Sequence, residues 1–247
     1  MSTELFAPAK LTLSLRVTGV RPDGFHEIDA EMVSLDLGDR LVVREGDGAD
    51  GLEIVGGGGG MDIGLDMGLD DNLVGRALRL AGRMAHVRIE KAVAAGAGLG
   101  GGSSDAAAIL RWAGFDDLVE AASIGADVAY CIVGGRARVS GMGEVVEPLS
   151  FEERTFTLLT PPVACSTPAV YRRWDDLGGP IGDHGNDLEP AAIDLVPELV
   201  RWRDDLADVT GKRPRLAGSG STWFVEGGYP GGERRVVRTV PQMVPSA

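Results

Sequence analysis

Apolar and polar residues alternate along the first part of the chain. Residues 10–19 follow this pattern, which is typical of a strand with one buried face. Residues 29–45 alternate in the same way, and Gly38 and Asp39 divide them into two predicted strands. A Pro-Asp-Gly turn signal at 22–24 separates the two regions. The pattern therefore predicts three strands before residue 46.

A helical pattern begins further along the chain. Residues 51–55 predict another strand, and residues 71–84 start with Asp and Asn and then place apolar residues at helical spacing. Between them, residues 56–70 are so rich in Gly and Asp that we expect a flexible loop. Its acidic residues do not have the spacing of an EF-hand calcium loop. Residues 86–93 alternate again and predict a strand, so the chain mixes strands with helices.

A glycine-rich loop follows at 94–102 and leads into a helix that we expect to end at Gly114, with Ser103, Ser104 and Asp105 as candidate caps. Glycine loses more backbone entropy on folding than any other residue, so the loop is either a slack linker or a place where the backbone approaches a ligand closely. A loop held between a strand and a helix start presents free amide groups and the positive end of the helix dipole. We therefore predict a phosphate-binding loop.

Two familiar phosphate loops do not fit this segment. Gly96, Gly98 and Gly101 satisfy the dinucleotide pattern G-x-G-x-x-G, and Asp116 follows at about the right distance. However, no second strand precedes Asp116, as contact with a ribose would require. The Walker A pattern is excluded because no Gly-Lys-[Ser/Thr] follows the loop.

Composition and charge narrow the class of protein. The 247 residues are 44% hydrophobic and 25% charged, which is typical of a soluble globular protein. The formal net charge of −13 argues against nucleic acid or an anionic membrane as a partner. The start of the chain does not resemble a signal peptide, and no apolar run approaches a membrane span, so we expect a cytoplasmic protein. Cys131 and Cys165 are expected to be reduced thiols, and the three histidines show no zinc-ligand spacing.

The glycine loop, "GAGLGGGSSDAA" (96–107), resembles the phosphate loop of the GHMP kinases. Other stretches resemble the branch of that family whose acceptor is a cytidine-diphosphate-linked alcohol: "APAKLTLSLRVTGVRPDGFHEIDAEMVSLDLGD" (7–39), "GADVAYCIVGGRARVSGMGE" (125–144), "STPAVYRRWD" (166–175), "NDLEPAA" (186–192), "RLAGSGSTWF" (215–224) and "VVRTVP" (236–241). They occur in the family's order and cover the chain from residue 7 to residue 241.

The resemblance implies an α+β, two-domain GHMP-kinase fold. We expect an N-terminal ribosomal-protein-S5-domain-2-like domain at 1–150, and a shortened C-terminal ferredoxin-like domain at 151–247. The chain departs from the family in three places. A helix between Asp105 and Asp127 is expected to be reduced or missing, residues 226–235 replace a helix, and the proline usual before the glycine loop is absent.

The resemblance also assigns roles to individual residues. It implies that Lys10 and Asp127 are the catalytic pair, with Asp127 accepting a proton from the acceptor hydroxyl and Lys10 orienting it. Without the resemblance, Lys10 would be an ordinary surface lysine and Asp127 a helix cap or a turn acid. The residues implied in ATP binding are Asn72, Lys91, Ala94, Ala95, Gly96, Ala97, Gly98, Leu99, Gly100, Gly101, Gly102, Ser103 and Ser104. Either serine could instead only cap the helix, Asn72 could be an N-cap, and Lys91 a solvated strand lysine.

The acceptor side is implied to bind a cytosine. Phe25 would stack on the base and His26 would hydrogen-bond to its edge, although the residues alone suggest only a turn aromatic and an exposed turn histidine. Tyr171 or Trp174 would close over the base, but residues spaced i, i+3 on a helix are more often part of a core. The turn at 217–222 would lie behind the glycine loop.

The resemblance therefore implies an ATP-dependent small-molecule kinase that phosphorylates a hydroxyl group of a cytidine-diphosphate substrate, with ATP and Mg²⁺ as cofactors. The alternatives are another GHMP small-molecule kinase and a nucleotide-binding relative that has lost catalysis. We expect a monomer or a weak homodimer with no nucleic-acid or membrane partner.

Overall fold

The computed structural model describes residues 2–45, 51–56 and 71–243, and all structural statements below concern these residues. The strands are β1 (Ser2–Val20), β2 (His26–Arg44), β3 (Gly51–Gly56), β4 (His86–Lys91), β5 (Arg136–Gly141), β6 (Val145–Pro148), β7 (Thr155–Leu159), β8 (Arg215–Leu216), β9 (Trp223–Glu226) and β10 (Arg235–Val240). The helices are α1 (Leu73–Leu80), α2 (Gly101–Trp112), α3 (Leu118–Ile124), α4 (Val128–Val133), α5 (Thr167–Asp176), α6 (Glu189–Leu195) and α7 (Leu199–Thr210).

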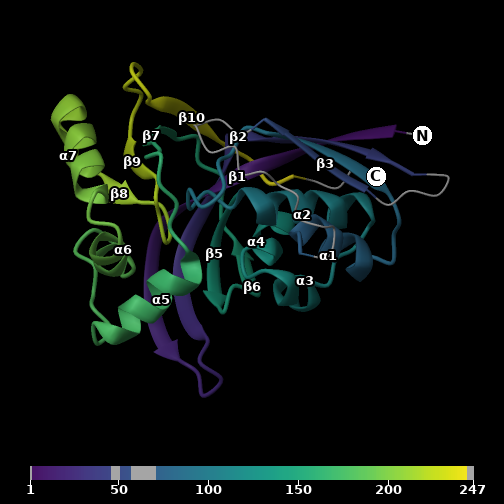
Figure 1. Ribbon diagram of the computed structural model, residues 1–247, viewed down its shortest axis with the longest axis horizontal. Coiled ribbons are helices and arrows are strands. Elements are labelled where there is room, and N and C mark those ends of the chain that lie inside the picture. Colours follow the sequence, from purple (N-terminus) through teal and green to yellow (C-terminus); the bar gives the residue numbers. More distant parts are fainter. Residues whose placement is uncertain (1, 46–50, 57–70, 244–247) are drawn as a thin grey trace.

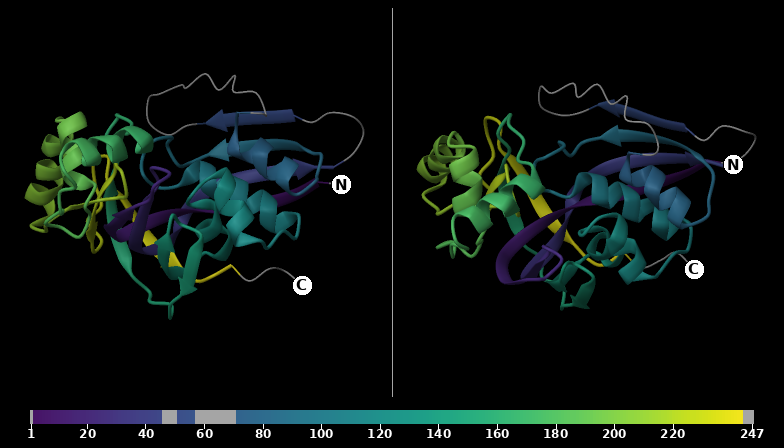
Figure 2. Two further views of the ribbon diagram at one scale, coloured as in Figure 1. Left: turned by 90° about the horizontal axis from the view of Figure 1, so that it is seen from below. Right: turned by 60° about the horizontal axis from the view of Figure 1, so that its bottom comes forward.

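The described strands form one connected sheet. Its main path runs β3-β4-β2-β10-β7-β9-β8, with β1 paired to β2, and β5 paired to both β2 and β6. Helices α1 to α4 lie against the β1–β5 part, and α5 to α7 lie beside β7 to β9 at the other end of the molecule (Figures 1 and 2). The mixed α+β architecture is confirmed. Because β10 pairs with strands from both halves of the chain, the sheet is continuous across the expected boundary at 150/151, and the division into two domains stays a prediction.

The prediction of two strands between residues 29 and 45 is wrong, because β2 continues through Gly38 and Asp39. Gly38 lies against β1, where an added Cβ would come within 2.4 Å of the Ala7 carbonyl oxygen and 2.6 Å of Phe6. The register shifts at this place, between Pro8 and Lys10 of β1. The glycine therefore permits a close approach of two paired strands, and it does not mark a turn.

Two apolar clusters form the core. In the larger cluster, the buried positions of β2 alternate at Ile28, Ala30 and Met32, and α2 contributes its buried stretch at 106–110. Each large aliphatic side chain fully buried in this way stabilises the fold by about 1.5–3 kcal/mol. The smaller cluster joins β1 and β2 to β7 and β9, where Phe156 and Phe224 meet edge to face at 5.9 Å. The smaller cluster therefore joins the two halves of the sheet.

Helix α1 is confirmed with Asn72 as its N-cap, since the Asn72 side chain accepts a hydrogen bond from the Val74 amide at 2.9 Å. The helix expected to be reduced is present as the seven-residue α3, and β9 and β10 are joined without a helix. Most of the loop expected at 56–70 lies outside the described residues. Cys131 and Cys165 are buried free thiols, as expected.

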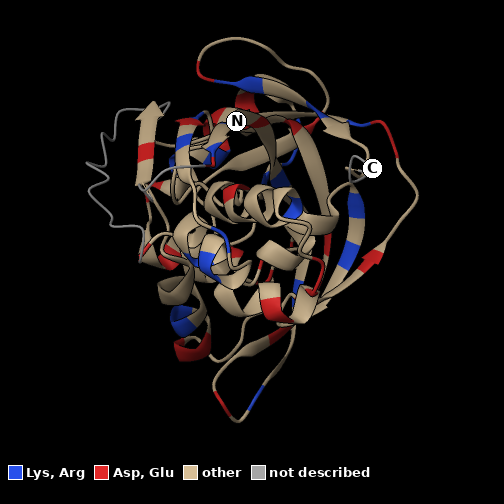
Figure 3. Cartoon of the chain, turned by 90° about the vertical axis from the view of Figure 1, so that its right-hand side faces the viewer, with Lys and Arg blue, Asp and Glu red and all other residues tan. Residues whose placement is uncertain are grey.

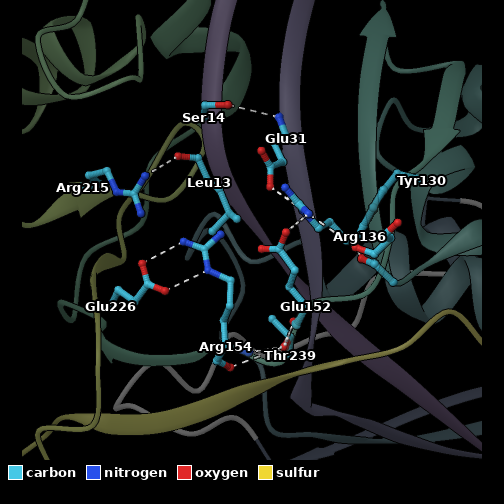
Figure 4. A network of polar contacts seen from close by, with 12 residues as sticks. Leu13, Ser14, Glu31, Tyr130, Arg136, Glu152, Arg154, Arg215, Glu226 and Thr239 are labelled. Carbon is cyan, nitrogen blue, oxygen red and sulfur yellow. Dashed lines mark hydrogen bonds and ion pairs between the residues drawn. The ribbon is translucent and has the colours of Figure 1, made fainter.

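Charged side chains tie the strands together at the surface. Arg154 binds Glu226 through two hydrogen bonds of 2.9 and 2.8 Å, and Arg136 binds Glu31 at 2.8 Å and also Glu152 (Figure 4). Figure 3 shows acidic and basic residues interspersed along the elements that face the viewer. Exposed pairs of this kind stabilise a protein only slightly, so the apolar clusters provide most of the stability of the fold.

None of the described helices is long and apolar enough to cross a bilayer.

Candidate active site

The glycine-rich loop connects the end of β4 to the start of α2. Gly96, Gly98 and Gly100 have φ angles of +69°, +77° and +67°, a left-handed conformation that other residues rarely adopt. The loop is packed on both sides, because the Ala97 carbonyl accepts a hydrogen bond from Thr222 at 3.1 Å and the Gly96 carbonyl accepts one from Cys165 at 3.2 Å. The segment is therefore an ordered part of the fold, and the alternative of a slack linker is wrong.

Glycine is required in this loop by neighbouring backbone as well as by conformation. A Cβ on Gly98 would lie 2.2 Å from the carbonyl oxygen of Ala217 and 2.7 Å from that of Gly220. Both oxygens belong to the turn at 217–222, so this turn does lie directly behind the glycine loop. A Cβ on Gly96 would lie 2.6 Å from the Cβ of Ala164. The glycines therefore let the loop pack closely against the turn at 217–222 and Ala164. The same loop residues also face a cavity.

Helix α2 begins at Gly101, with Gly100 as its N-cap residue and no side-chain cap. The expectation that Ser103, Ser104 or Asp105 caps this helix is therefore wrong, because the helix starts earlier than the sequence suggests. The Ser104 hydroxyl is buried and donates to the carbonyl of Pro8 at 2.7 Å. Ser103 instead lines a cavity above the loop. The first amide groups of the helix have no partner within it, and they point toward the loop end.

Lys10 and Asp127 form an ion pair beside the loop. The Nζ atom of Lys10 lies 3.1 Å from Oδ2 of Asp127 and 3.1 Å from the Thr12 hydroxyl, and the lysine side chain is only 7% exposed. Asp127 stands at the N-cap position of α4, but its side chain makes no capping hydrogen bond. Lys10 is therefore a buried residue with a fixed ammonium group, and the alternative of an ordinary surface lysine is wrong.

A cavity of about 520 Å³ brings most of the predicted site residues together. Its walls include Lys10 and Asp127, all of the loop from 94 to 102, and the predicted residues Asn72, Lys91, Ser103 and Tyr171. Apolar residues from β1, β2, β3 and β4 complete it, among them Leu15, Met32 and Ile89. Ser104, Phe25 and His26 are not among the lining residues. The cavity therefore combines a glycine loop, an ion pair and an apolar wall.

Phe25 and His26, predicted to bind the cytosine, lie at the tip of the β1–β2 hairpin. This tip extends beside α5, which carries Tyr171 and Trp174 (Figure 1). The His26 ring lies 4.7 Å from the Tyr171 ring and 5.6 Å from the Trp174 ring, and its Nε2 atom lies 2.8 Å from Oδ1 of Asp175. Phe25 is 61% exposed. Burial raises the pKa of the Tyr171 hydroxyl, and the nearby Asp127 carboxylate acts in the same direction. Since Tyr171 also lines the cavity, it connects the hairpin tip to the ion pair.

Lys91 is held between two carboxylates. Its Nζ atom lies 2.5 Å from Oδ2 of Asp39 and 2.8 Å from Oδ2 of Asp105, and its side chain is 13% exposed, so the alternative of a solvated strand lysine is wrong. The other oxygen of Asp39 accepts from the Ala92 and Val93 amides at 2.6 and 2.9 Å. Burial lowers the pKa of Lys91, but the two carboxylates outweigh burial and the net shift is upward.

Asp105 is the less well satisfied of these two acids. Its second oxygen has no hydrogen-bond partner among the described residues. Burial raises the pKa of its carboxyl group to about 7, and Asp39 adds to that shift while Lys91 opposes it. The sequence pattern assigns no place in the site to Asp39, Asp105 or Thr12. Gly38 and Asp39 together have the composition of a turn, and the only signal for Asp39 is an acidic residue after that glycine.

Comparison with known proteins places this geometry in a class. No family model matches the chain. The crystal structure of homoserine kinase from Cytophaga hutchinsonii has the same fold, with a TM-score of 0.57 at 19% identity over 98% of this chain and 95% of that chain. This likeness shows the fold. The chain is a GHMP kinase, as kinases at 30% identity or more show.

Two further comparisons are more specific. A crystal structure of 4-(cytidine 5'-diphospho)-2C-methyl-D-erythritol kinase superposes with a TM-score of 0.72 at 30% identity, covering 96% of this chain and 98% of that one. The 4-diphosphocytidyl-2-C-methyl-D-erythritol kinase of Cereibacter sphaeroides is 38% identical over 250 residues, which cover 90% of this chain and 88% of the relative. The chain belongs to the 4-diphosphocytidyl-2-C-methyl-D-erythritol kinase family, and the resemblance seen in its motifs is confirmed.

Proposed function

We propose that this protein transfers the γ-phosphoryl group of ATP to the 2-hydroxyl of 4-diphosphocytidyl-2-C-methyl-D-erythritol, a step of non-mevalonate isoprenoid biosynthesis. The observation that carries the proposal is the Lys10–Asp127 pair, joined at 3.1 Å in the same cavity as the glycine loop. Phosphoryl transfer asks a protein mainly to position its reactants and to stabilise charge. The glycine loop offers amide donors for the phosphate charge, and the Lys10–Asp127 pair positions a base beside that loop.

Asp127 is the general base in this proposal. A bond forms between the acceptor oxygen and the γ-phosphorus, and the bond from that phosphorus to the β–γ bridging oxygen breaks, so ADP leaves with the electron pair. The hydroxyl proton passes to the Asp127 carboxylate, which is one-third exposed and faces the cavity. Lys10 would orient the carboxylate and the acceptor oxygen through its ammonium group. Positioned acid–base catalysis of this kind contributes about 10²–10⁴-fold.

The nucleotide would lie along the glycine loop. Amide groups of 96–102 would donate to its phosphates, and the Ser103 hydroxyl lies on the same wall of the cavity. Asn72, at the start of α1, and Lys91 would lie on the nucleoside side of the loop. This arrangement fits a triphosphate because the positive φ angles and the absence of side chains let it approach the backbone.

Mg²⁺ fits this site as a partner of the nucleotide. The described residues hold no group of three or more potential metal ligands, and Mg²⁺ commonly binds through substrate phosphates and one or two protein groups. We propose the Ser103 hydroxyl as one such group. When bound, the ion would neutralise charge on the phosphate oxygens.

The hairpin tip would hold the cytosine. The exposed Phe25 ring offers a stacking surface, and the His26 ring, fixed by Asp175, Tyr171 and Trp174, would present its remaining nitrogen to the base edge. Base stacking on an aromatic side chain is worth about 1–3 kcal/mol. Of the two aromatics considered for closing the site, Tyr171 lines the cavity while Trp174 donates to the Pro180 carbonyl at 2.9 Å. We therefore propose Tyr171.

A coupled assay of ADP release separates the alternatives. The cytidine substrate should support ADP release at least 100-fold faster than homoserine or mevalonate at equal concentration. Preference for homoserine or mevalonate would instead indicate a different GHMP small-molecule kinase. ATP binding in calorimetry without ADP release from any acceptor would indicate a relative that has lost catalysis, an outcome kept open by the short α3.

The replacement Asp127→Asn tests the base directly. The amide keeps the shape of the side chain and removes its ability to accept a proton, so we expect both substrates to bind and the single-turnover rate constant to fall by about 10²–10⁴-fold. Transfer from labelled ATP measures the rate constant, and a thermal melt checks the fold. Turnover near the wild-type rate would show that Asp127 is not the base.

A further inference from the structure

The dipeptide Asn186–Asp187 lies between the turn at 217–222 and strand β1. Both residues are buried, with 3% and 4% of their surface exposed. The Asn186 side-chain amide donates to the Leu216 carbonyl at the end of β8 at 2.9 Å and to the Gly218 carbonyl in the turn at 2.7 Å, while its oxygen accepts from the Leu188 amide at 3.0 Å. Nδ2 donates two of these bonds and Oδ1 accepts the third, so Asn186 fixes the turn at 217–222 to the start of α6.

That turn is in contact with the catalytic machinery. A Cβ on Gly218 would lie 3.4 Å from the Lys10 Nζ atom and 3.6 Å from the Thr12 hydroxyl, so the backbone at 218 closes one side of the lysine ammonium. The same turn contains the Ala217 and Gly220 carbonyl oxygens that leave no room for a Cβ on Gly98. A displacement of the turn would therefore reach both Lys10 and the glycine loop.

Asp187 binds strand β1, on the side of the dipeptide away from the turn at 217–222. Its Oδ1 atom accepts from Arg16 at 2.5 Å and from the Gly182 amide at 3.0 Å, and its Oδ2 atom accepts from the Val17 amide at 3.0 Å. Arg16 and Val17 belong to β1, in the half that leads to the hairpin tip. The backbone supports this contact, because Leu15 donates to the Gly185 carbonyl at 2.7 Å and accepts from Asp187 at 3.0 Å.

We propose that Asn186 and Asp187 are positioning residues that act on opposite sides of the reaction. Asn186 holds the turn that places Lys10 and the glycine loop, and Asp187 holds the strand that carries the acceptor hairpin. The inference rests on the proposed kinase function. It predicts a split that general destabilisation would not give, because the two neighbouring residues should affect different kinetic constants.

Asn186→Asp tests the phosphate side. The carboxylate keeps the acceptor for Leu188 but replaces two donated hydrogen bonds with repulsion from two carbonyls. We expect the single-turnover rate constant with labelled ATP to fall by about 10- to 100-fold at saturating acceptor, because displacement of reacting groups by about 1 Å costs about 10²-fold. The dissociation constant for ATP, measured by calorimetry, should change less than fivefold.

Asp187→Asn tests the acceptor side. It removes the negative charge that binds Arg16 and so weakens the attachment of β1, the strand that leads to the proposed cytosine site. The KM for the cytidine substrate should therefore rise by about 10-fold or more. The rate constant at saturating acceptor should stay within threefold of the wild type. If Asp187→Asn lowered the rate constant and left KM unchanged, the two-sided assignment would be wrong.

A matched control is available at Thr157, in the neighbouring part of the sheet. Thr157 is buried and binds a turn through two hydrogen bonds, donating to the Gly227 carbonyl at 2.7 Å and accepting from the Tyr229 amide at 2.9 Å. Thr157→Val should lower the melting temperature while the rate constant stays the same. An unfolded fraction lowers the amplitude of a single turnover and leaves its rate constant unchanged, so the two effects can be distinguished.

The outcomes separate this inference from the proposed function. If the wild type transfers phosphate and Asn186→Asp keeps the wild-type rate constant, the positioning role is wrong. An equal loss of rate constant in Thr157→Val would overturn it as well. If Asn186→Asp does not fold, the same measurements apply to Asn186→Ser, which keeps one donor and introduces no charge. A wild type that transfers phosphate to no acceptor would overturn the proposed function itself.

Discussion

Replacing Gly98 by alanine should displace the glycine loop, because the new methyl group would overlap neighbouring backbone atoms. The new Cβ would lie 2.2 Å from the Ala217 carbonyl oxygen and 2.7 Å from that of Gly220, whereas ordinary contacts of a Cβ begin near 3.4 Å. Either the loop or the turn must therefore move by about 1 Å. The φ angle of +77° adds strain of about 1–2 kcal/mol for a residue with a Cβ.

The magnitude follows from these two terms. A displacement of about 1 Å at a reacting group costs about 10²-fold in rate, so we expect kcat/KM of Gly98→Ala to fall by about 10²-fold. Strain of 1–2 kcal/mol lowers the melting temperature of a domain of this size by about 2–8 °C. Steady-state kinetics, calorimetry with ATP and a thermal melt measure the three quantities on the same preparation.

Two other glycines provide controls. Gly114 has a φ angle of +73° and no atom within 4 Å of an added Cβ, so Gly114→Ala measures the conformational strain alone. Gly102 has no positive φ, and its Cβ would meet only Leu73 at 3.7 Å, so Gly102→Ala measures a methyl group beside the same loop. If Gly98→Ala retained the activity of Gly102→Ala, the argument from close backbone approach would be refuted.

Two further replacements test the acceptor site and a buried acid. Phe25→Ala should raise the KM for the cytidine substrate by about 5- to 150-fold with an unchanged KM for ATP, because the exposed ring is proposed to stack on the base; a matching rise for ATP would contradict that role. Burial raises the pKa of Glu189 from 4.5 to about 7, so its stabilising effect is full below pH 4.5 and is lost as the pH rises through 7. Glu189→Gln should therefore remove about 2–3 kcal/mol from the change in unfolding free energy between pH 5 and pH 9. Melting temperatures that depend on pH in the variant as they do in the wild type would contradict the raised pKa of Glu189.

The sequence predicts the part of the site whose residues are adjacent along the chain. A strand, a run of glycines and a helix start are adjacent along the chain, so the loop from 94 to 102 can be recognised from the amino-acid sequence alone. Lys10 and Asp127 are far apart in sequence, and only the family resemblance joins them. Their contact at 3.1 Å is a property of the fold.

The remaining features depend on contacts between distant segments. Asp39 binds Lys91, which is 52 residues away, and nothing local distinguishes it from a turn acid. Gly38 is a residue type typical of turns, but the chain does not reverse there. Glycine is required because the β1 backbone lies too close for a Cβ. Ser104 has the residue type of a helix cap, yet its hydroxyl is used by the Pro8 carbonyl. The cytoplasmic location and the oligomeric state stay predictions.

Lys10 contacts both the glycine loop and the proposed base, Asp127, and so fixes the distance between them. Its backbone amide donates to the Leu99 carbonyl at 2.9 Å, and its side-chain stem occupies the space beside Gly100, where a Cβ would lie 2.6 Å from Cγ. Its ammonium group then pairs with Asp127. Two unit charges about 4 Å apart interact by about 1–4 kcal/mol between water and a protein surface, so an unpaired carboxylate at this place would repel a triphosphate. One lysine thus attaches the base to the loop and offsets the charge that would otherwise oppose ATP, and Gly100 is required because the lysine stem needs the room.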